Sequence, residues 1–209
     1  MKHETTLRIY TAEMRALENS DNKEVVIEGT PIVFNQWTHI GGEDPEEGFD
    51  EVLVPMSFVN TDMRDVVLTI EHDGRKIPLA RTKNGKGTMT LTKTAQGINM
   101  RAVLDVENNT EARAVYSAIK RGDLDKMSFL FIVAQDGDTW VYENNRYKRE
   151  IHAVEKLLDV SIVARPAYSG TSVELSRSEV DALGGMLDDM KRVKEIELLK
   201  EKNKILANI

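Results

Sequence analysis

Residues 129–163 carry the clearest strand pattern in the chain, and they begin with the apolar run Phe129-Leu130-Phe131-Ile132-Val133-Ala134. A run of similar character, residues 157–163, closes this region. Residues 139–142 and 146–152 lie between the two runs, and Asp, Gly and Asn residues typical of turns separate the segments at 136–138 and 143–145. We therefore predict four successive β-strands in this part of the chain.

The N-terminal half continues the β pattern. Val25–Val33 is rich in β-branched residues, and Gly29 and Pro31 predict a strand that bends or ends near them. Residues 66–70 form a short apolar run, typical of a strand buried on both faces. Residues 88–92 and 98–106 alternate in polarity around residues 95–97, which predicts a hairpin.

Two segments have helical character. Thr110–Arg121 has an apolar stripe at three- to four-residue spacing, a capping residue in Asn109 or Thr110, and Gly122 as a stop signal. Residues 177–209 lack aromatic residues and proline, and their apolar side chains recur every three or four positions. This pattern predicts an amphipathic helix. We expect an α+β fold with a β-rich core over residues 1–175 and a C-terminal helical segment over residues 176–209.

The composition limits the kinds of functional site that the chain can contain. The 209 residues contain no cysteine and four histidines that do not cluster, so we expect no metal site and no cofactor. The formal net charge of −7 argues against a nucleic-acid-coating protein. No apolar run approaches the ~20 residues that cross a bilayer, and the N-terminus lacks the apolar stretch of a secretion signal. We expect a soluble intracellular protein, and any catalysis must use Ser, His and carboxylates.

The segment 43–51 carries six acidic residues in nine positions. Such density could suggest a calcium loop, but the spacing of an EF-hand is absent. We therefore predict a solvated surface loop.

His72 and Ser128 have the most suitable contexts for nucleophilic chemistry. His72 directly follows the predicted strand 66–70, and Ser128 opens the apolar run at 129. A nucleophilic serine needs an imidazole within hydrogen-bond reach. Taken singly, each residue is better explained as an ordinary one, His72 as a surface histidine and Ser128 as a serine that satisfies a strand-end backbone group.

Several blocks of sequence resemble, in order, the prohead (capsid maturation) protease family of tailed bacteriophages, which is distantly similar in fold to herpesvirus assemblin. The resemblance spans roughly residues 5–175, and alanine stands at position 80 where the family more commonly has glycine. The blocks are 49–58, 67–73 with Glu71-His72-Asp73, 78–81, Gly122-Asp123-Leu124 leading to Met127-Ser128-Phe129, and 158–163 followed by Pro166-Ala167-Tyr168.

The resemblance implies a serine endopeptidase with Ser128 as nucleophile and His72 as general base. The family's third member is commonly a glutamate just before Val-Ser in the last block, and that position is Asp159 here. Herpesvirus relatives use a second histidine instead, which makes His152 the alternative. Arg165 is the candidate donor for the oxyanion hole, with a surface cation as its other interpretation.

The same resemblance implies a closed or nearly closed β-barrel of mixed strands flanked by helices. It implies work inside the assembling procapsid, in the host bacterial cytoplasm, without nucleic acid or membrane partners. The expected substrates are scaffolding protein, the N-terminal scaffold-like segment of the major capsid protein, and the protease itself. Assemblin-like proteases often dimerise, so a homodimer is one oligomeric state to consider.

Two alternatives to the protease stay open at this point, and so does the role of the C-terminal segment. The chain could be a non-catalytic capsid assembly or scaffold protein with the same fold. It could also be a β-rich ligand-binding domain unrelated to phages. The C-terminal segment could bind scaffold or capsid subunits and be removed by self-cleavage, or pack on the β core as an extra helix. The presence of serine, histidine and an acid where the blocks need them favours the protease.

Overall fold

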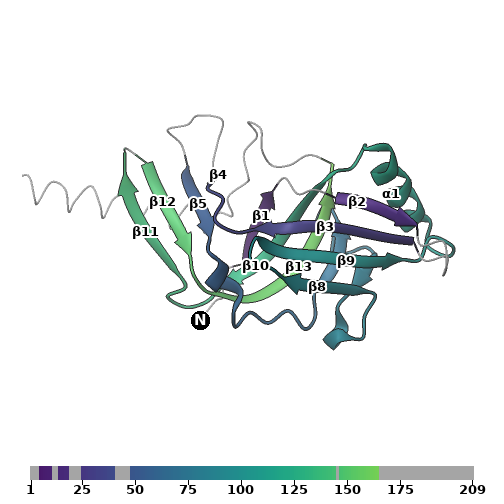
Figure 1. Cartoon of the computed structure of the whole chain (residues 1–209), viewed down its shortest axis with the longest axis horizontal. Helices are drawn as coiled ribbons and strands as arrows, with labels where there is room; N and C mark the ends of the chain where they lie inside the picture. Colours follow the sequence, from purple (N-terminus) through teal and green to yellow (C-terminus); the bar gives the residue numbers. More distant parts are fainter. Residues whose placement is uncertain (1–4, 11–13, 19–24, 41–47, 145, 165–209) are drawn as a thin grey trace, which may run out of the picture. The chain divides into compact units, whose positions relative to one another are not determined.

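The computed structural model describes residues 5–10, 14–18, 25–40, 48–144 and 146–164. Within these ranges the chain forms three β-sheets, one α-helix and two short 3₁₀ helices (Figure 1). None of the described helices is long and apolar enough to span a membrane. The predicted helical segment 176–209 lies outside the described residues.

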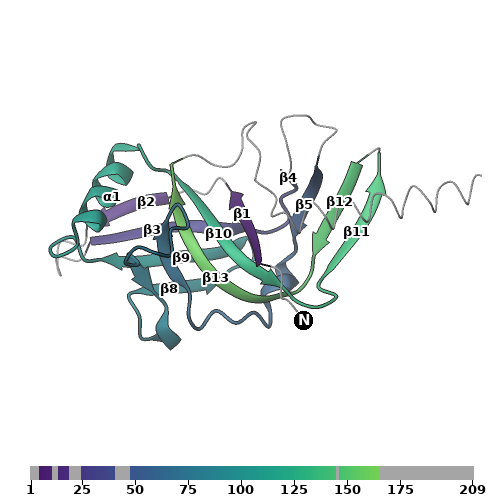
Figure 2. The ribbon, with the colours of Figure 1, turned by 180° about the vertical axis from the view of Figure 1, so that it is seen from behind.

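The central sheet has five strands in the order β1-β10-β13-β6-β7. β10 and β13 are long, curved strands that lie side by side (Figures 1 and 2). β13 runs parallel to β6 and antiparallel to β10, so the sheet is mixed, as the family resemblance implied. The bounds are β1 Thr5–Tyr10, β10 Lys126–Val133, β13 Val154–Val163, β6 Val67–Ile70 and β7 Ala80–Arg81.

A second sheet has the order β2-β3-β9-β8 and is antiparallel throughout. The predicted hairpin is present as β8 and β9. The ladder between β3 and β9 is interrupted from Gly29 to Ile32, which confirms the irregularity expected around Gly29 and Pro31 because proline has no N–H to donate. The bounds are β2 Met14–Glu18, β3 Val25–Val33, β9 Gly97–Leu104 and β8 Met89–Lys93.

A third sheet has the order β11-β12-β5-β4. β11 and β12, two of the predicted strands, form a hairpin, and β12 pairs in parallel with β5. The bounds are β11 Asp138–Glu143, β12 Arg146–Ile151, β5 Phe49–Leu53 and β4 Thr38–Ile40.

The helices occupy the connections between strands. α1 spans Thr110–Arg121, as predicted, and the Asn109 side chain accepts hydrogen bonds from the first-turn amides of Glu111 and Ala112. Gly122 ends the helix in a left-handed conformation. The 3₁₀ helices are η1 Pro55–Phe58 and η2 Lys83–Gly85, so the proline of the 49–58 block begins a short 3₁₀ helix.

The central strands divide their side chains between two faces. Met127, Phe129 and Phe131 of β10 are fully buried in the main hydrophobic core, and the rings of the two phenylalanines stack at 5.2 Å. Burial of each such side chain contributes ~1.5–3 kcal/mol. Ser128, between them in sequence, therefore faces the opposite side of the sheet.

The expectation of a closed barrel is wrong. Within the described residues the strands form three separate sheets, and their edge strands do not pair with one another to close a cylinder. The expected flanking helices are also reduced to one α-helix in these residues. Closure requires a hydrogen-bonded partner for every edge strand, and apolar patterning specifies faces but not such partners.

The prediction of a solvated loop over 43–51 is wrong for its last three residues. They belong to β5, and Glu51 is fully buried, with its carboxylate bonded to Arg149 of β12 at 3.1 Å. Residues 43–47 lie outside the described residues. One of the acidic residues of this segment, Glu51, thus belongs to a buried ion pair, and its partner Arg149 is 98 residues away in the sequence.

Candidate active site

Three polar side chains lie in one row across the central sheet. The backbone of Ser128 in β10 pairs with that of Ser161 in β13, which in turn pairs with that of Thr69 in β6. Residues that pair directly share a face of the sheet. Because the neighbours of Ser128 enter the core, this row lies on the face opposite to that core.

Asp159 lies on the same face, because it stands two residues before Ser161 in β13 and no register shift separates them. Between β10 and β13 the register shifts at Leu158, since Leu130 pairs with Asp159 and Phe131 pairs with Leu157. The extra residue precedes Asp159 and reverses the alternation there, so Leu157 enters the core on the same side as Val160, while Asp159 keeps the face of Ser161. Asp159 is only 6% exposed.

A tight turn after β6 returns the chain toward these residues. Its two central residues, Glu71 and His72, have left-handed backbones with φ of 51° and 54°, and the amide of Asp73 donates to the carbonyl of Ile70 at 3.0 Å. This is the pattern of a type I′ turn, which glycine and asparagine normally fill. Each non-glycine residue there costs about 1 kcal/mol, so the surrounding contacts must hold the turn in place.

The turn is fixed at Glu71 by two contacts with the end of β13. The Glu71 amide donates to the carbonyl of Ile162 at 3.0 Å. The Glu71 carboxylate accepts the amide of Ala164 at 2.6 Å. The turn that carries His72 is therefore tied to the strand that carries Asp159.

The three sequence-predicted residues meet at hydrogen-bond distance. His72 Nε2 lies 2.6 Å from Ser128 Oγ, and His72 Nδ1 lies 2.6 Å from Asp159 Oδ1. An ionised carboxylate only accepts, so Nδ1–H donates to Asp159. In the neutral imidazole, Nε2 is then free to accept the hydroxyl proton of Ser128.

These contacts are shielded from water. Ser128 is fully buried, and the side chain of His72 is 13% exposed. A low-dielectric environment strengthens each hydrogen bond in the series. A shallow hollow lined by residues 71–75 adjoins the His72 side of the cluster.

Two hydroxyl groups complete the cluster, and sequence reasoning missed both. Thr69 Oγ1 lies 3.0 Å from Asp159 Oδ2 and 3.1 Å from Ser161 Oγ, and Ser161 Oγ accepts the backbone N–H of His72 at 2.9 Å. Thr69 and Ser161 are almost fully buried. The available signal was a lone polar residue inside an apolar strand, because a buried hydroxyl requires a partner.

A pair of charged residues lies beside the cluster. Arg75 donates to Asp73, the residue after His72, and these hydrogen bonds hold the pKa of the Asp73 carboxyl below its usual value of 3.8. Asp73 is therefore ionised at neutral pH and places a negative charge at the exposed edge of the turn.

The other histidine candidates lie elsewhere. His152 follows β12, and its Nε2 contacts the carbonyl of Asp136 at 3.1 Å, so it is held by the β10–β11 connection. His39 belongs to β4 and contacts Asp50, which also binds Arg146. His3 and Arg165 lie outside the described residues.

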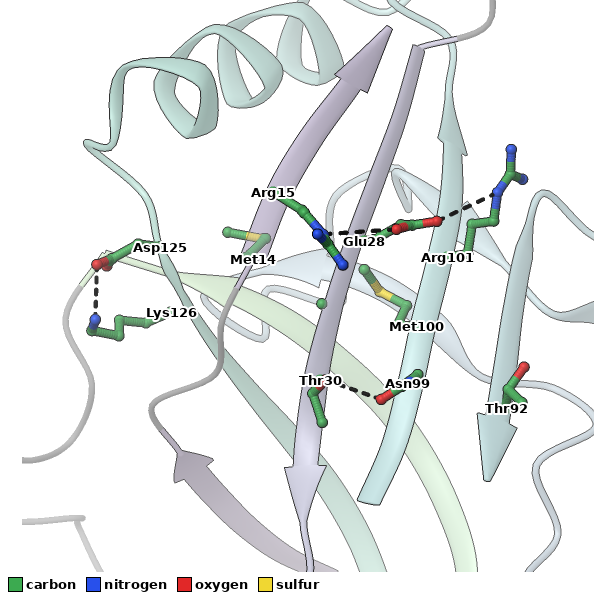
Figure 3. A pocket seen from close by; sticks show the side chains of 11 residues that line it. Met14, Arg15, Glu28, Thr30, Thr92, Asn99, Met100, Arg101, Asp125 and Lys126 are labelled. Carbon is green, nitrogen blue, oxygen red and sulfur yellow. Dashed lines mark hydrogen bonds and ion pairs between the residues drawn. The ribbon is translucent and has the colours of Figure 1, made fainter. Parts of the chain in front are cut away.

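A larger hollow of about 740 Å³ lies over β2, β3 and β9 (Figure 3). Arg15 and Arg101 flank Glu28 there, each 3.9 Å from its carboxylate, and Met14 and Met100 supply apolar surface. Its lining includes Lys126 but not His72, Ser128 or Asp159. Within the described part of the chain, no group of three acidic or histidine side chains is placed to hold a metal ion.

Comparison with known proteins identifies the family. The fold is similar to that of the capsid assembly protease gp21 of bacteriophage T4, with a TM-score of 0.50 and 9% sequence identity over 78% of this chain and 99% of that chain. No curated protein sequence matches the chain. The family model described as caudovirus prohead serine protease matches residues 10–185. The chain therefore belongs to the caudovirus prohead serine protease family.

Proposed function

We propose that this prohead serine protease cleaves peptide bonds with Ser128 as nucleophile, His72 as general base and Asp159 as the residue that orients His72. The single observation that carries this assignment is the unbroken series from Ser128 Oγ through the imidazole to Asp159, with two contacts of 2.6 Å. A nucleophile within reach of a base that is itself oriented by a third group is the arrangement that nucleophilic catalysis requires.

The proposed reaction follows from these contacts. Ser128 Oγ attacks the scissile carbonyl carbon while His72 Nε2 takes the hydroxyl proton. The tetrahedral intermediate collapses, the C–N bond breaks, and His72 gives that proton to the leaving amine. Water then attacks the acyl-enzyme, with His72 again as base, which releases the new carboxylate and restores the serine hydroxyl.

Asp159 has a defined part in this reaction. Its contact with Nδ1 fixes the tautomer that leaves Nε2 free to accept, and its negative charge stabilises the imidazolium that forms. Aspartate is one methylene shorter than the glutamate that is common at this position in the family. The shorter side chain still reaches the imidazole, since Asp159 Oδ1 lies 2.6 Å from His72 Nδ1.

We propose as substrates the scaffolding protein, the N-terminal scaffold-like segment of the major capsid protein, and the protease itself, all inside the procapsid. Support comes from the family, whose description names a prohead enzyme, and from the capsid assembly role in the name of the T4 protein of similar fold. The division at residue 175, with a C-terminal segment for targeting or removal, remains part of the same proposal.

The test combines self-cleavage with processing in trans. The full chain and its Ser128→Ala variant are expressed alone and together with the scaffold and major capsid protein of the same phage, and products are identified by intact-mass spectrometry. We expect discrete cleavage products and labelling by a fluorophosphonate probe only with the unsubstituted serine. Ser117→Ala, on the exposed face of α1, is the matched control and should retain both activities.

The same experiment separates the enzyme from a non-catalytic assembly protein. Cleavage that persists in Ser128→Ala would exclude Ser128 as nucleophile. Normal procapsid assembly without any cleavage by the unsubstituted chain would favour the assembly role.

A further inference from the structure

Four hydrogen bonds around His72 form a closed ring. The His72 backbone N–H donates to Ser161 Oγ, and Ser161 Oγ contacts Thr69 Oγ1. Thr69 Oγ1 contacts the Asp159 carboxylate, which contacts the His72 imidazole. The ring therefore begins on the backbone of the histidine and returns to its imidazole. One network therefore holds both the backbone position of His72 and the orientation of its imidazole.

The direction of each hydrogen bond follows from the chemistry of the groups. The Asp159 carboxylate only accepts, so Thr69 must donate its single hydroxyl proton to Oδ2. Thr69 Oγ1 can then only accept from Ser161, whose hydroxyl proton points toward it. Ser161 Oγ still has a lone pair for the N–H of His72. Every donor and acceptor of the two hydroxyl groups in this ring thus has one consistent role.

The ring also accounts for the backbone of the turn. His72 has φ of 54°, a conformation in which a histidine is strained, and its N–H would be buried without an acceptor if Ser161 were absent. The bond to Ser161 therefore holds the strained turn, and the bond from Thr69 fixes the rotation of the carboxylate that faces His72.

We propose that Thr69 and Ser161 are positioning residues of this protease: Thr69 orients the Asp159 carboxylate, and Ser161 holds His72 in its left-handed turn. The proposal rests on the proposed roles of Ser128, His72 and Asp159. Neither hydroxyl contacts Ser128 Oγ in the hydrogen bonds of the site, so both act through the residues that they hold.

The test uses substitutions that remove a hydroxyl with little change of volume. Thr69→Val and Ser161→Ala are compared with Thr69→Ser, which keeps the donor. Thr82→Val is the matched control, because Thr82 is also buried and its hydroxyl binds only backbone groups, the amide of Val66 and the carbonyl of Met63. All variants are made in the full chain.

Three measurements distinguish positioning from a structural role. They are kcat and KM on a peptide that spans the self-cleavage site, the rate of fluorophosphonate labelling of Ser128, and the chemical shift of the His72 Nδ1 proton. For Thr69→Val and Ser161→Ala we expect kcat and the labelling rate to fall roughly 10- to 100-fold, with KM nearly unchanged. In Thr69→Val the Nδ1 proton should also move upfield. Thr69→Ser should recover most of kcat, and Thr82→Val should lower only the thermal midpoint.

The outcomes separate this inference from the proposed function. If Ser128→Ala is inactive but Thr69→Val and Ser161→Ala retain the kcat of the parent, the positioning role is excluded and the triad assignment stands. If Ser128→Ala remains active, the triad assignment itself fails. If Thr69→Val does not fold, Thr69→Ser and Ser161→Ala decide the question, and loss of activity in Thr69→Ser equal to that in Ser161→Ala would overturn the role of the Thr69 hydroxyl.

Discussion

Arg149 in β12 lies directly opposite Glu51 in β5, and its guanidinium donates to the Glu51 carboxylate at 3.1 Å. Arg149 also bonds Asp138 at 2.6 Å, and its guanidinium lies 5.3 Å from the ring centroid of Trp140. Because Glu51 is fully buried, water cannot take the place of Arg149 as the partner of its carboxylate. One arginine thus connects β5, β12 and β11.

The first prediction concerns this pair. Arg149→Ala removes the cation that faces a buried carboxylate, and such a change costs ~3–5 kcal/mol of unfolding free energy. Replacing both partners, as in Glu51→Leu with Arg149→Met, should recover much of that loss. Urea unfolding measures both variants. Arg121→Ala, which breaks an exposed pair with Asp123, is the control and should cost about 1 kcal/mol or less. Equal losses in Arg149→Ala and Arg121→Ala would contradict the prediction.

The second prediction decides between Asp159 and His152 as the third member of the triad. Asp159→Asn keeps the size of the side chain but no longer favours the tautomer that His72 needs, so kcat should fall by up to ~10⁴-fold while the protein stays folded. His152→Ala should keep the parental kcat, since its ring binds the Asp136 carbonyl. Peptide cleavage rates measure both. If His152→Ala does not cleave the peptide and Asp159→Asn cleaves it at the parental rate, His152 and not Asp159 is the third member of the triad.

The third prediction concerns two glycines. Gly97 approaches the β3 backbone so closely that an added Cβ would lie 2.0 Å from the carbonyl oxygen of Ile32, whereas Gly122 has open space and a left-handed φ of 80°. Gly122→Ala should therefore cost about 1–2 kcal/mol, from backbone strain alone. Gly97→Ala must also displace a strand and should cost more. Chemical denaturation compares the two, and the opposite order would mean that β3 and β9 separate easily at this point.

The fourth prediction concerns pH. Hydrogen bonds from Arg81 hold the pKa of the Asp65 carboxyl below its ordinary 3.8. A lowered folded-state pKa means that Asp65 stabilises the fold above pH ~4 and that this contribution disappears as pH falls through the folded value. Asp65→Asn should therefore be less stable than the parent at pH 7, and the difference should shrink as the pH falls below ~4. Urea midpoints across this range test the prediction. A difference that does not shrink as the pH falls below ~4 would assign the effect to the shape of the side chain rather than to its charge.

The sequence predicted local elements well and long-range partners poorly. The helix Thr110–Arg121 and the β8–β9 hairpin depend on caps, turns and periodicity within short windows, and they were correct. Whether the strands form three sheets or one barrel depends on which edge strands pair with each other. The sequence pattern of a single strand does not specify its partner. Glu51 was misjudged for the same reason, because its partner Arg149 is 98 residues away.

The candidate site was likewise predicted only in part from the sequence. His72, Ser128 and Asp159 were named from blocks of sequence, and the structure brings them together. Thr69 and Ser161 carry no motif of their own. Their proximity follows from the parallel register of β6 and β13, in which the two residues are direct partners, and this register is a property of the assembled sheet.

The strand order of the central sheet has a consequence for when activity can arise during synthesis. His72 and Ser128 belong to segments that leave the ribosome before β13, yet β13 lies between β6 and β10 and supplies Asp159. A nascent chain that ends before residue 154 thus holds the proposed base and nucleophile on strands that have no common neighbour. The proposed site therefore cannot form before β13 has been made and has paired between β6 and β10.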